Sequence, residues 1–332
     1  MLNTVLITGG RIRPGGFDLG DGRQYESANL LRLNLNTGDV ELLIEKNKGN
    51  QNYPDEYPNL QFTAGCVHED DLWLSTDTEI INYSYPSLEE KRVISHSSFN
   101  NIHSVTYIDD LLWITSTGLD TVVVAEPQTG KIIELINAEE KPLWHRFSSE
   151  VDYRKVHSTR PHDCHPNYVF KYDGDYWVTR CKQEDAVCLS DNSKRINISG
   201  DSKTISVHDG IVWKDKIYFT SVDGCIVIAD PKSHAVEETI DICKENNLNR
   251  MGWCRGMHID ADGFIYLGFS SIRKTRQTKK LAWLGNKVDE VLGKTACMVV
   301  YDSNKREIVR KYDIEHKYLD AIYSVLPEPG AS

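Results

Sequence analysis

A unit of about forty residues recurs along the chain. Each copy has an apolar segment, a tight turn rich in Asp and Gly, a second apolar segment with an aromatic residue, and two further segments, as in "HSVTYIDDLLWITSTGLDTVVVAEPQTGKIIELIN". The aromatic positions are 40, 64, 41 and 48 residues apart and are Trp73, Trp113, Trp177, Tyr218 and Tyr266. A period of about 40–45 residues is typical of a four-stranded propeller blade. The longer intervals then require insertions.

The two ends of the chain each supply part of one more copy. "AIYSVLPEP" at the C-terminus has the pattern of an inner strand without partners, and "TVLITGG", "NLLRLNLNTG" and "VELLIE" at the N-terminus have the pattern of the strands that it lacks. Joining them would close a ring and remove two open sheet edges. We therefore predict an all-β, six-bladed β-propeller that forms a single domain over residues 1–332. A β-sandwich followed by a second all-β domain is the alternative, but it does not explain the split copy.

Composition limits the partners and the compartment. The formal net charge is 38 − 49 = −11, which disfavours nucleic acid and anionic membrane as partners. No apolar run reaches the roughly 18–20 residues of a membrane span, and "MLNTVLITGG" lacks the pattern of a secretory signal. The eight cysteines match no zinc spacing and indicate reduced thiols, so we expect a cytoplasmic protein.

The long irregular segments should all lie on one face of the propeller. With strands named A to D outward, the B–C and D–A connections emerge on the same face. The four long segments are of these two kinds: Gly10–Asn29, Lys46–Asn59, Asn137–Cys164 and Ser271–Thr295. Tolerated insertions would be spread over both faces, whereas long loops gathered on one face are typical of a binding surface.

Histidines recur at the predicted mouth of the central channel on that face. Counting ten positions back from each aromatic residue reaches the start of each inner strand and gives Thr63, His103, Asn167, His208 and Gly256. His165, in "RPHDCHPNYVF", lies two residues before Asn167. Three consecutive blades would thus direct an imidazole to one region. His103, His165 and His208 could hold a divalent metal (Zn, Mn, Fe or Mg), act as general bases without a metal, or only bind water and a neighbouring loop.

Further polar residues are expected near this mouth. Arg255 could clamp an anionic group or form a salt bridge with Asp209. Asp163, and His162 beside it, could transfer a proton or orient a metal ligand. We assign substrate contacts to Asn167, Trp253 and Asp120 as well as Arg255. The insertion after Ser271 begins with a run of basic residues: Arg273, Lys274, Arg276, Lys279 and Lys280. If the insertion covers the mouth, these residues suggest an anionic ligand; the alternative is that they form the solvated start of a helix.

The function classes left open are an enzyme and a binding scaffold. No dinucleotide-binding glycine motif, P-loop or Gly-x-Ser-x-Gly elbow is present. We expect an enzyme that acts as a lyase, isomerase or hydrolase on a small polar, anionic substrate, with His103, His165, His208, Asp163 and Arg255 as catalytic residues. The alternative is a non-catalytic propeller that binds a protein or glycan through the same face. Aromatic residues of the long loops favour that alternative: Tyr53, Tyr57, Trp144 and Trp283.

The repeat and the axial histidines resemble a six-bladed superfamily that includes gluconolactonase/regucalcin-like hydrolases, streptogramin lyase-like proteins and NHL-type propellers. Gluconolactonase-like members bind calcium through Glu, Asn and Asp on the axis; only Asn167 matches here. Streptogramin lyase-like members use axial histidine with a divalent ion, and this resemblance implies a metal at His103, His165 and His208. The segments "STGLD", "HPNYVF" and "GWCRG" are similar to uncharacterised bacterial propeller proteins.

Overall fold

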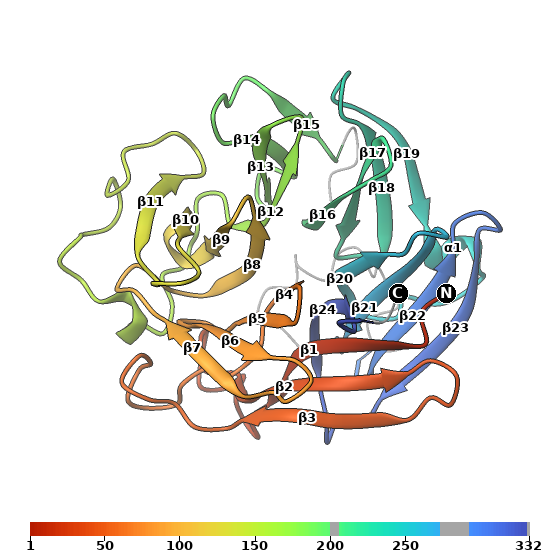
Figure 1. The fold of residues 1–332 in the computed structure, drawn as a ribbon, viewed down its shortest axis with the longest axis horizontal. Coiled ribbons are helices and arrows are strands. Elements are labelled where there is room, and N and C mark those ends of the chain that lie inside the picture. The colour runs from red at the N-terminus through yellow and green to blue at the C-terminus, as the bar shows by residue number, and fades with distance from the viewer. Residues whose placement is uncertain (200–205, 273–291, 331–332) are drawn as a thin grey trace.

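The computed structural model describes residues 1–199, 206–272 and 292–330, and their strands form six four-stranded antiparallel sheets arranged around a centre (Figure 1). Blades 1 to 3 consist of β4 (Cys66–His68), β5 (Asp71–Ser75), β6 (Ile80–Ser84) and β7 (Glu90–Ile94); β8 (Ile102–Ile108), β9 (Leu111–Ser116), β10 (Thr121–Ala125) and β11 (Ile132–Asn137); and β12 (Pro166–Tyr172), β13 (Asp175–Arg180), β14 (Asp185–Cys188) and β15 (Arg195–Asn197). The six-bladed propeller is confirmed.

Blades 4 and 5 follow in chain order, and blade 6 combines the two ends of the chain. Their strands are β16 (Val207–Trp213), β17 (Lys216–Ser221), β18 (Cys225–Asp230) and β19 (Ala235–Asp241); β20 (Trp253–Ile259), β21 (Phe264–Ser270), β22 (Ala296–Asp302) and β23 (Glu307–Ile314); and β24 (Ala321–Pro327), β1 (Thr4–Ile12), β2 (Tyr25–Asn34) and β3 (Val40–Lys46). The described helices are short: η1 (Thr117–Leu119), η2 (Tyr153–Lys155) and α1 (Ile242–Glu245).

The closure of the ring is as predicted. β24 is the inner strand of blade 6 and pairs antiparallel with β1, for example Leu6 with Leu326 and Ile7 with Val325. The two termini therefore lie close together in Figure 1. This pairing covers the edge of β1 that would otherwise be open to another chain.

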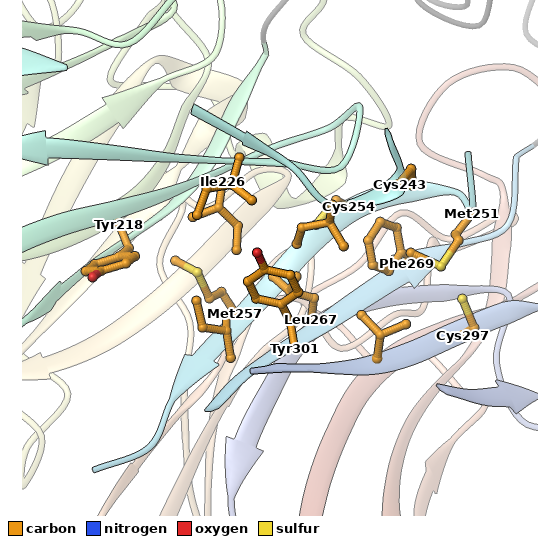
Figure 2. Close-up of a cluster of buried hydrophobic side chains, with 14 of the residues drawn as sticks. Tyr218, Ile226, Cys243, Met251, Cys254, Met257, Leu267, Phe269, Cys297 and Tyr301 are labelled. Carbon is orange, nitrogen blue, oxygen red and sulfur yellow. The ribbon is translucent and has the colours of Figure 1, made fainter. Parts of the chain in front are cut away.

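The hydrophobic core lies mainly between adjacent blades. In Figure 2, Tyr218 and Ile226 of blade 4 lie beside Met257 and Leu267 of blade 5, within one buried cluster. The five repeated aromatic residues occupy the second strand of blades 1 to 5, and all are buried. Each sheet thus buries both faces against its neighbours, which explains fully apolar segments such as Val122–Val124.

Two of the four long connections contact each other, as expected if they share a face. Arg154 Nη1 donates to Asn52 Oδ1 at 2.9 Å, and Lys155 Nζ donates to the carbonyl of Tyr53 at 2.8 Å, which joins the segments after β11 and β3. The loop predicted at Gly10–Asn29 is shorter than expected, because β1 and β2 stay paired up to Ile12 and Tyr25. Most of the Ser271–Thr295 segment, including its basic residues and Trp283, lies outside the described residues.

Candidate functional site at the channel mouth

The inner strands share a break in register at the same level of the channel. In blades 2 to 6 the pairing of the inner strand with its neighbour skips one or two residues, as between Ile102 and Ser104 in β8. The skipped residues are His103, Asn167, His208 with Asp209, Arg255 with Gly256, and Tyr323. Bulges re-aim side chains and are frequent beside active sites. Five strands therefore place irregular backbone and polar side chains at one level.

Threonine hydroxyls fill the gaps that these breaks leave in the sheets. Thr115, Thr179 and Thr220 each accept a hydrogen bond from a backbone amide of their own blade, namely that of Ser104, Tyr168 and Asp209, at 2.9, 3.1 and 3.0 Å. Thr115 also donates to the carbonyl of Asn167 in the next blade, and Thr179 to that of His208, at 3.2 and 2.6 Å. The hydroxyls of Thr115 and Thr179 thus each satisfy two backbone groups on neighbouring blades, which buried backbone requires.

Three histidines come together at this level, as predicted. The ring centroids of His103 and His165 are 4.7 Å apart, and those of His103 and His208 are 5.6 Å apart. His162 joins them, because its Nδ1 lies 2.6 Å from Nδ1 of His165. Desolvation by burial, followed by the neighbouring positive groups, lowers the pKa of both His103 and His165 well below the usual value. These imidazoles are therefore neutral near pH 7.

His208 forms a buried dyad with Asp209. Its Nδ1 lies 2.6 Å from Oδ1 of Asp209, and the other carboxylate oxygen accepts the amide of Met257 at 3.0 Å. Because a carboxylate only accepts, Nδ1 carries the proton, and Nε2 presents its lone pair when the ring is neutral. Burial is the main cause that lowers the pKa of His208, while Asp209 acts in the opposite direction. The arrangement fixes the tautomer and orientation of the His208 ring, which a general base would require.

Three buried atoms at the mouth have no hydrogen-bond partner among the described residues: Nδ1 of His103, Nε2 of His208 and Oδ1 of Asn167. The amide nitrogen of Asn167 donates to the carbonyl of Val207 at 2.8 Å, so its oxygen is the free end. Buried polar atoms in native proteins nearly always have partners. These three atoms are available to water or to a ligand.

Arg255 lies at the same level, and its side chain is 9% exposed. Its guanidinium lies over the ring of Tyr323, with Cζ 4.7 Å from the centroid, and Nη1 donates to Ser270 Oγ at 3.4 Å. Within the described residues no carboxylate lies within 4.0 Å of it, so the salt bridge to Asp209 does not form. Buried arginine is normally paired with an anion. The predicted anion clamp is thus available for a ligand.

Asp120 was predicted to contact the substrate, but its carboxylate is bonded to the loop that carries His165. It is fully buried, and its carboxylate accepts the amides of Asp163, Cys164 and His165 at 2.8, 3.0 and 2.8 Å, as well as Arg146 Nη1 at 2.8 Å. These bonds fix the loop that carries His165, whose backbone has φ of 59°. Asp120 is therefore a positioning residue for the histidine cluster.

The remaining predicted residues are in other environments. Asp163 forms ion pairs on the loop surface with Lys141, His145 and Arg146 at 3.0, 3.1 and 3.0 Å. Trp253 starts β20 and is partly buried. Tyr53 of the proposed aromatic rim points inward, where its hydroxyl donates to Glu79 at 2.9 Å.

Two residues of the site were missing from the sequence-based assignment. Asp209 was considered only as a partner for Arg255, and Tyr323 was not considered. The signal for Tyr323 was present, because it occupies in the C-terminal strand the position that His103 and His208 occupy in theirs.

The predicted metal centre receives no direct support from the structure. Among the described residues, no three His, Cys, Asp or Glu side chains are arranged to hold a metal ion.

Comparisons with known proteins support the fold. No protein family and no curated protein matches the sequence. A protein of unknown function from Bacteroides caccae is similar in structure, with a TM-score of 0.63, 10% identity, and coverage of 98% of this chain and 99% of that chain. A chain of the nidogen/laminin complex aligns with a TM-score of 0.56 and 9% identity over 97% of both chains. Together with the blade arrangement, these similarities place the protein in the class of six-bladed β-propellers.

Proposed function

We propose that the protein is an enzyme that uses His208 as a general base on a small polar, anionic substrate bound at the channel mouth. The His208–Asp209 dyad with its unpartnered Nε2 is the observation that carries this proposal. A base held in one tautomer and kept largely neutral by burial is ready to accept a proton near pH 7. A purely structural histidine would be expected to use both ring nitrogens for internal hydrogen bonds.

The neighbouring residues have complementary roles in this proposal. Arg255 binds the anionic group of the substrate, since its buried guanidinium has no acidic partner among the described residues. Asp209 orients His208 and stabilises the imidazolium that forms after proton transfer. Proton abstraction next to a bound anionic group is a step shared by lyases and isomerases, and a base that activates water serves a hydrolase.

The same site could hold the divalent metal that the sequence predicts. The unpartnered nitrogens Nδ1 of His103 and Nε2 of His208 are suitable ligand atoms, and a metal-binding histidine commonly donates its other N–H to a carboxylate, as His208 does. A bound metal would polarise a substrate oxygen. Elemental analysis tests this: a stoichiometric metal that is lost in the His103→Ala, His208→Ala double variant would establish the site.

The base is tested by hydrogen exchange into candidate substrates. The protein is incubated in D₂O with a panel of small carboxylates and phosphate esters, and loss of carbon-bound protons is followed by ¹H NMR. His208→Gln and Asp209→Asn should slow the exchange by about 10²–10⁴-fold, the range of general acid–base catalysis. Lys48→Gln, an exposed cation on the same face, should leave it unchanged. Exchange that is equally fast in His208→Gln would refute the proposed base.

We also propose a cytoplasmic location. The eight cysteines all lie in the described part of the chain as thiols, and most are buried, as expected in a reducing compartment. No helix among the described residues has the length and apolar character to cross a membrane.

A further inference from the structure

The unpartnered atoms of the mouth define the hydrogen-bonding groups that a ligand must bring. Asn167 Oδ1 can only accept a hydrogen bond, and His208 Nε2 accepts one when its ring is neutral. The ligand must therefore donate at these two places. Hydroxyl groups fit, since each has one donor and can accept in turn from other groups.

The positive charge at the mouth limits how much negative charge the anionic group of a ligand can carry. Arg255 supplies a buried positive charge that has no acidic partner among the described residues, whereas Arg160, on the loop before His162, is paired with Asp21 at 3.6 Å. The carboxylate of Asp209, the residue after His208, already accepts hydrogen bonds from His208 and from the amide of Met257. A singly charged carboxylate matches one guanidinium in a bidentate pair. A phosphate group, close to doubly charged at pH 7, would remain partly uncompensated in this buried setting.

We infer that the ligand is a small hydroxylated carboxylate, with its carboxylate at Arg255 and its hydroxyls donating to His208 Nε2 and Asn167 Oδ1. This inference rests on the proposed function, because it assigns the chemical class of that same ligand. The site then recognises both the charge and the hydroxyls. An analogue without hydroxyls leaves buried acceptors unpaired, and such sites discriminate strongly against analogues of this kind.

The test compares ligands that differ in one feature at a time. Propionate, lactate and glycerate form a series with successive hydroxyl groups, quinate and cyclohexanecarboxylate form a ring-based pair, and glycerol and glycerol phosphate change the charge. Binding to the full-length protein is measured by isothermal titration calorimetry. Quinate or glycerate should bind about 10- to 100-fold more tightly than its unhydroxylated partner, as expected for hydrogen bonds to charged or buried groups. Glycerol and the phosphate ester should bind more weakly than glycerate.

Two variants separate the two recognition elements. Arg255→Gln should weaken every carboxylate by about 10- to 100-fold, whereas Asn167→Leu should weaken only the hydroxylated members. Lys48→Gln is the control for a general loss of positive charge. Circular dichroism establishes that each variant is folded, and Asn167→Ser provides a smaller change if Asn167→Leu does not fold.

The outcomes distinguish this inference from the proposed function. Equal affinity for hydroxylated and plain carboxylates, with dependence on Arg255, would overturn the inference but leave an anion-binding enzyme site. Binding that is lost in EDTA and restored by a divalent ion would also overturn it, because the ion would then be the partner of the free atoms. If no member of the panel binds in an Arg255-dependent manner, both the inference and the proposed anionic substrate are wrong.

Discussion

Replacing Asp120 by Asn should detach the loop that carries His165. Asp120 Oδ1 accepts the amides of Cys164 and His165, and Oδ2 accepts the amide of Asp163 and Arg146 Nη1. An asparagine side chain has one oxygen and one NH₂ group, so either orientation turns two of these four bonds into contacts between donors. Asn also tolerates the left-handed backbone of this position, where φ is 55°. The substitution therefore tests the carboxylate alone.

The magnitude follows from the number of bonds lost. A hydrogen bond to a charged group contributes about 1.5–3 kcal/mol, so two lost bonds cost about 3–6 kcal/mol. The loop can move into water instead of keeping both faulty contacts, which favours the lower figure, about 3 kcal/mol. This corresponds to about 150-fold faster opening of the loop. With an unfolding entropy of about 0.7 kcal/mol per degree for a chain of this length, global Tm should fall by at most about 4 °C.

Hydrogen–deuterium exchange measures this effect directly. The amides of Asp163, Cys164 and His165 should exchange about 150-fold faster in Asp120→Asn, while inner-strand amides such as that of Val105 keep their protection. Asp163→Asn is the matched control, because its ion pairs are partly exposed and should contribute no more than about 1 kcal/mol. Unchanged protection at the three amides would show that Asp120 does not hold the loop.

Three other measurements follow from the same structure. Deleting residues 321–332 removes β24, so size-exclusion chromatography should show an aggregated or unfolded chain, whereas deletion of residues 329–332 should leave the protein folded. A 321–332 deletion that stays monomeric and equally stable would contradict the closure. Thr179→Val removes the hydroxyl that bonds Tyr168 and His208, and should lower the free energy of unfolding, measured in urea, by about 2 kcal/mol. Thr129→Val, at an exposed position, should leave this free energy unchanged, and Thr179→Ser should restore most of the loss. Burial lowers the pKa of His165, so below about pH 6.5 the unfolded chain binds more protons than the folded one, and stability should fall as the pH drops from 7 to 5. His165→Gln should make the slope of Tm against pH shallower. An identical slope in the variant would count against a neutral buried imidazole.

The blade repeat and the positions of the histidines were predictable because both follow from the sequence period. Trp113 and Trp177 mark second strands, and a fixed count back from them reaches the inner strands of blades 2 and 3. The closure by β24 was predictable for the same reason. The count fails at Gly256, because the break in β20 spans two residues and Arg255 lies beside it. A side chain at Gly256 would meet the backbone of Ser324 at 2.4 Å.

The dyad was not predictable from strand periodicity. Neighbouring residues in a regular strand point to opposite faces, so His208 and Asp209 should not meet. They do because the register breaks between Val207 and Gly210. Such a break depends on contacts with adjacent blades, here the bond from Thr179 to the carbonyl of His208. A local signal was nevertheless present: the aromatic residue of blades 2, 3 and 4 is followed two positions later by Thr115, Thr179 and Thr220.

These threonines also explain why the polar groups at the mouth have free atoms. Irregular backbone at the centre of a propeller must find hydrogen-bond partners, and side chains such as His103 or Asn167 could have supplied them. The hydroxyls of Thr115 and Thr179 serve the backbone instead, each bonding two strands. With the backbone satisfied in this way, Nδ1 of His103, Nε2 of His208 and Oδ1 of Asn167 are left without partners among the described residues at one level of the channel. A channel built only for stability would have little reason to retain three such atoms beside an arginine that has no acidic partner among the described residues. This is the physical basis of our proposal that the mouth binds a ligand.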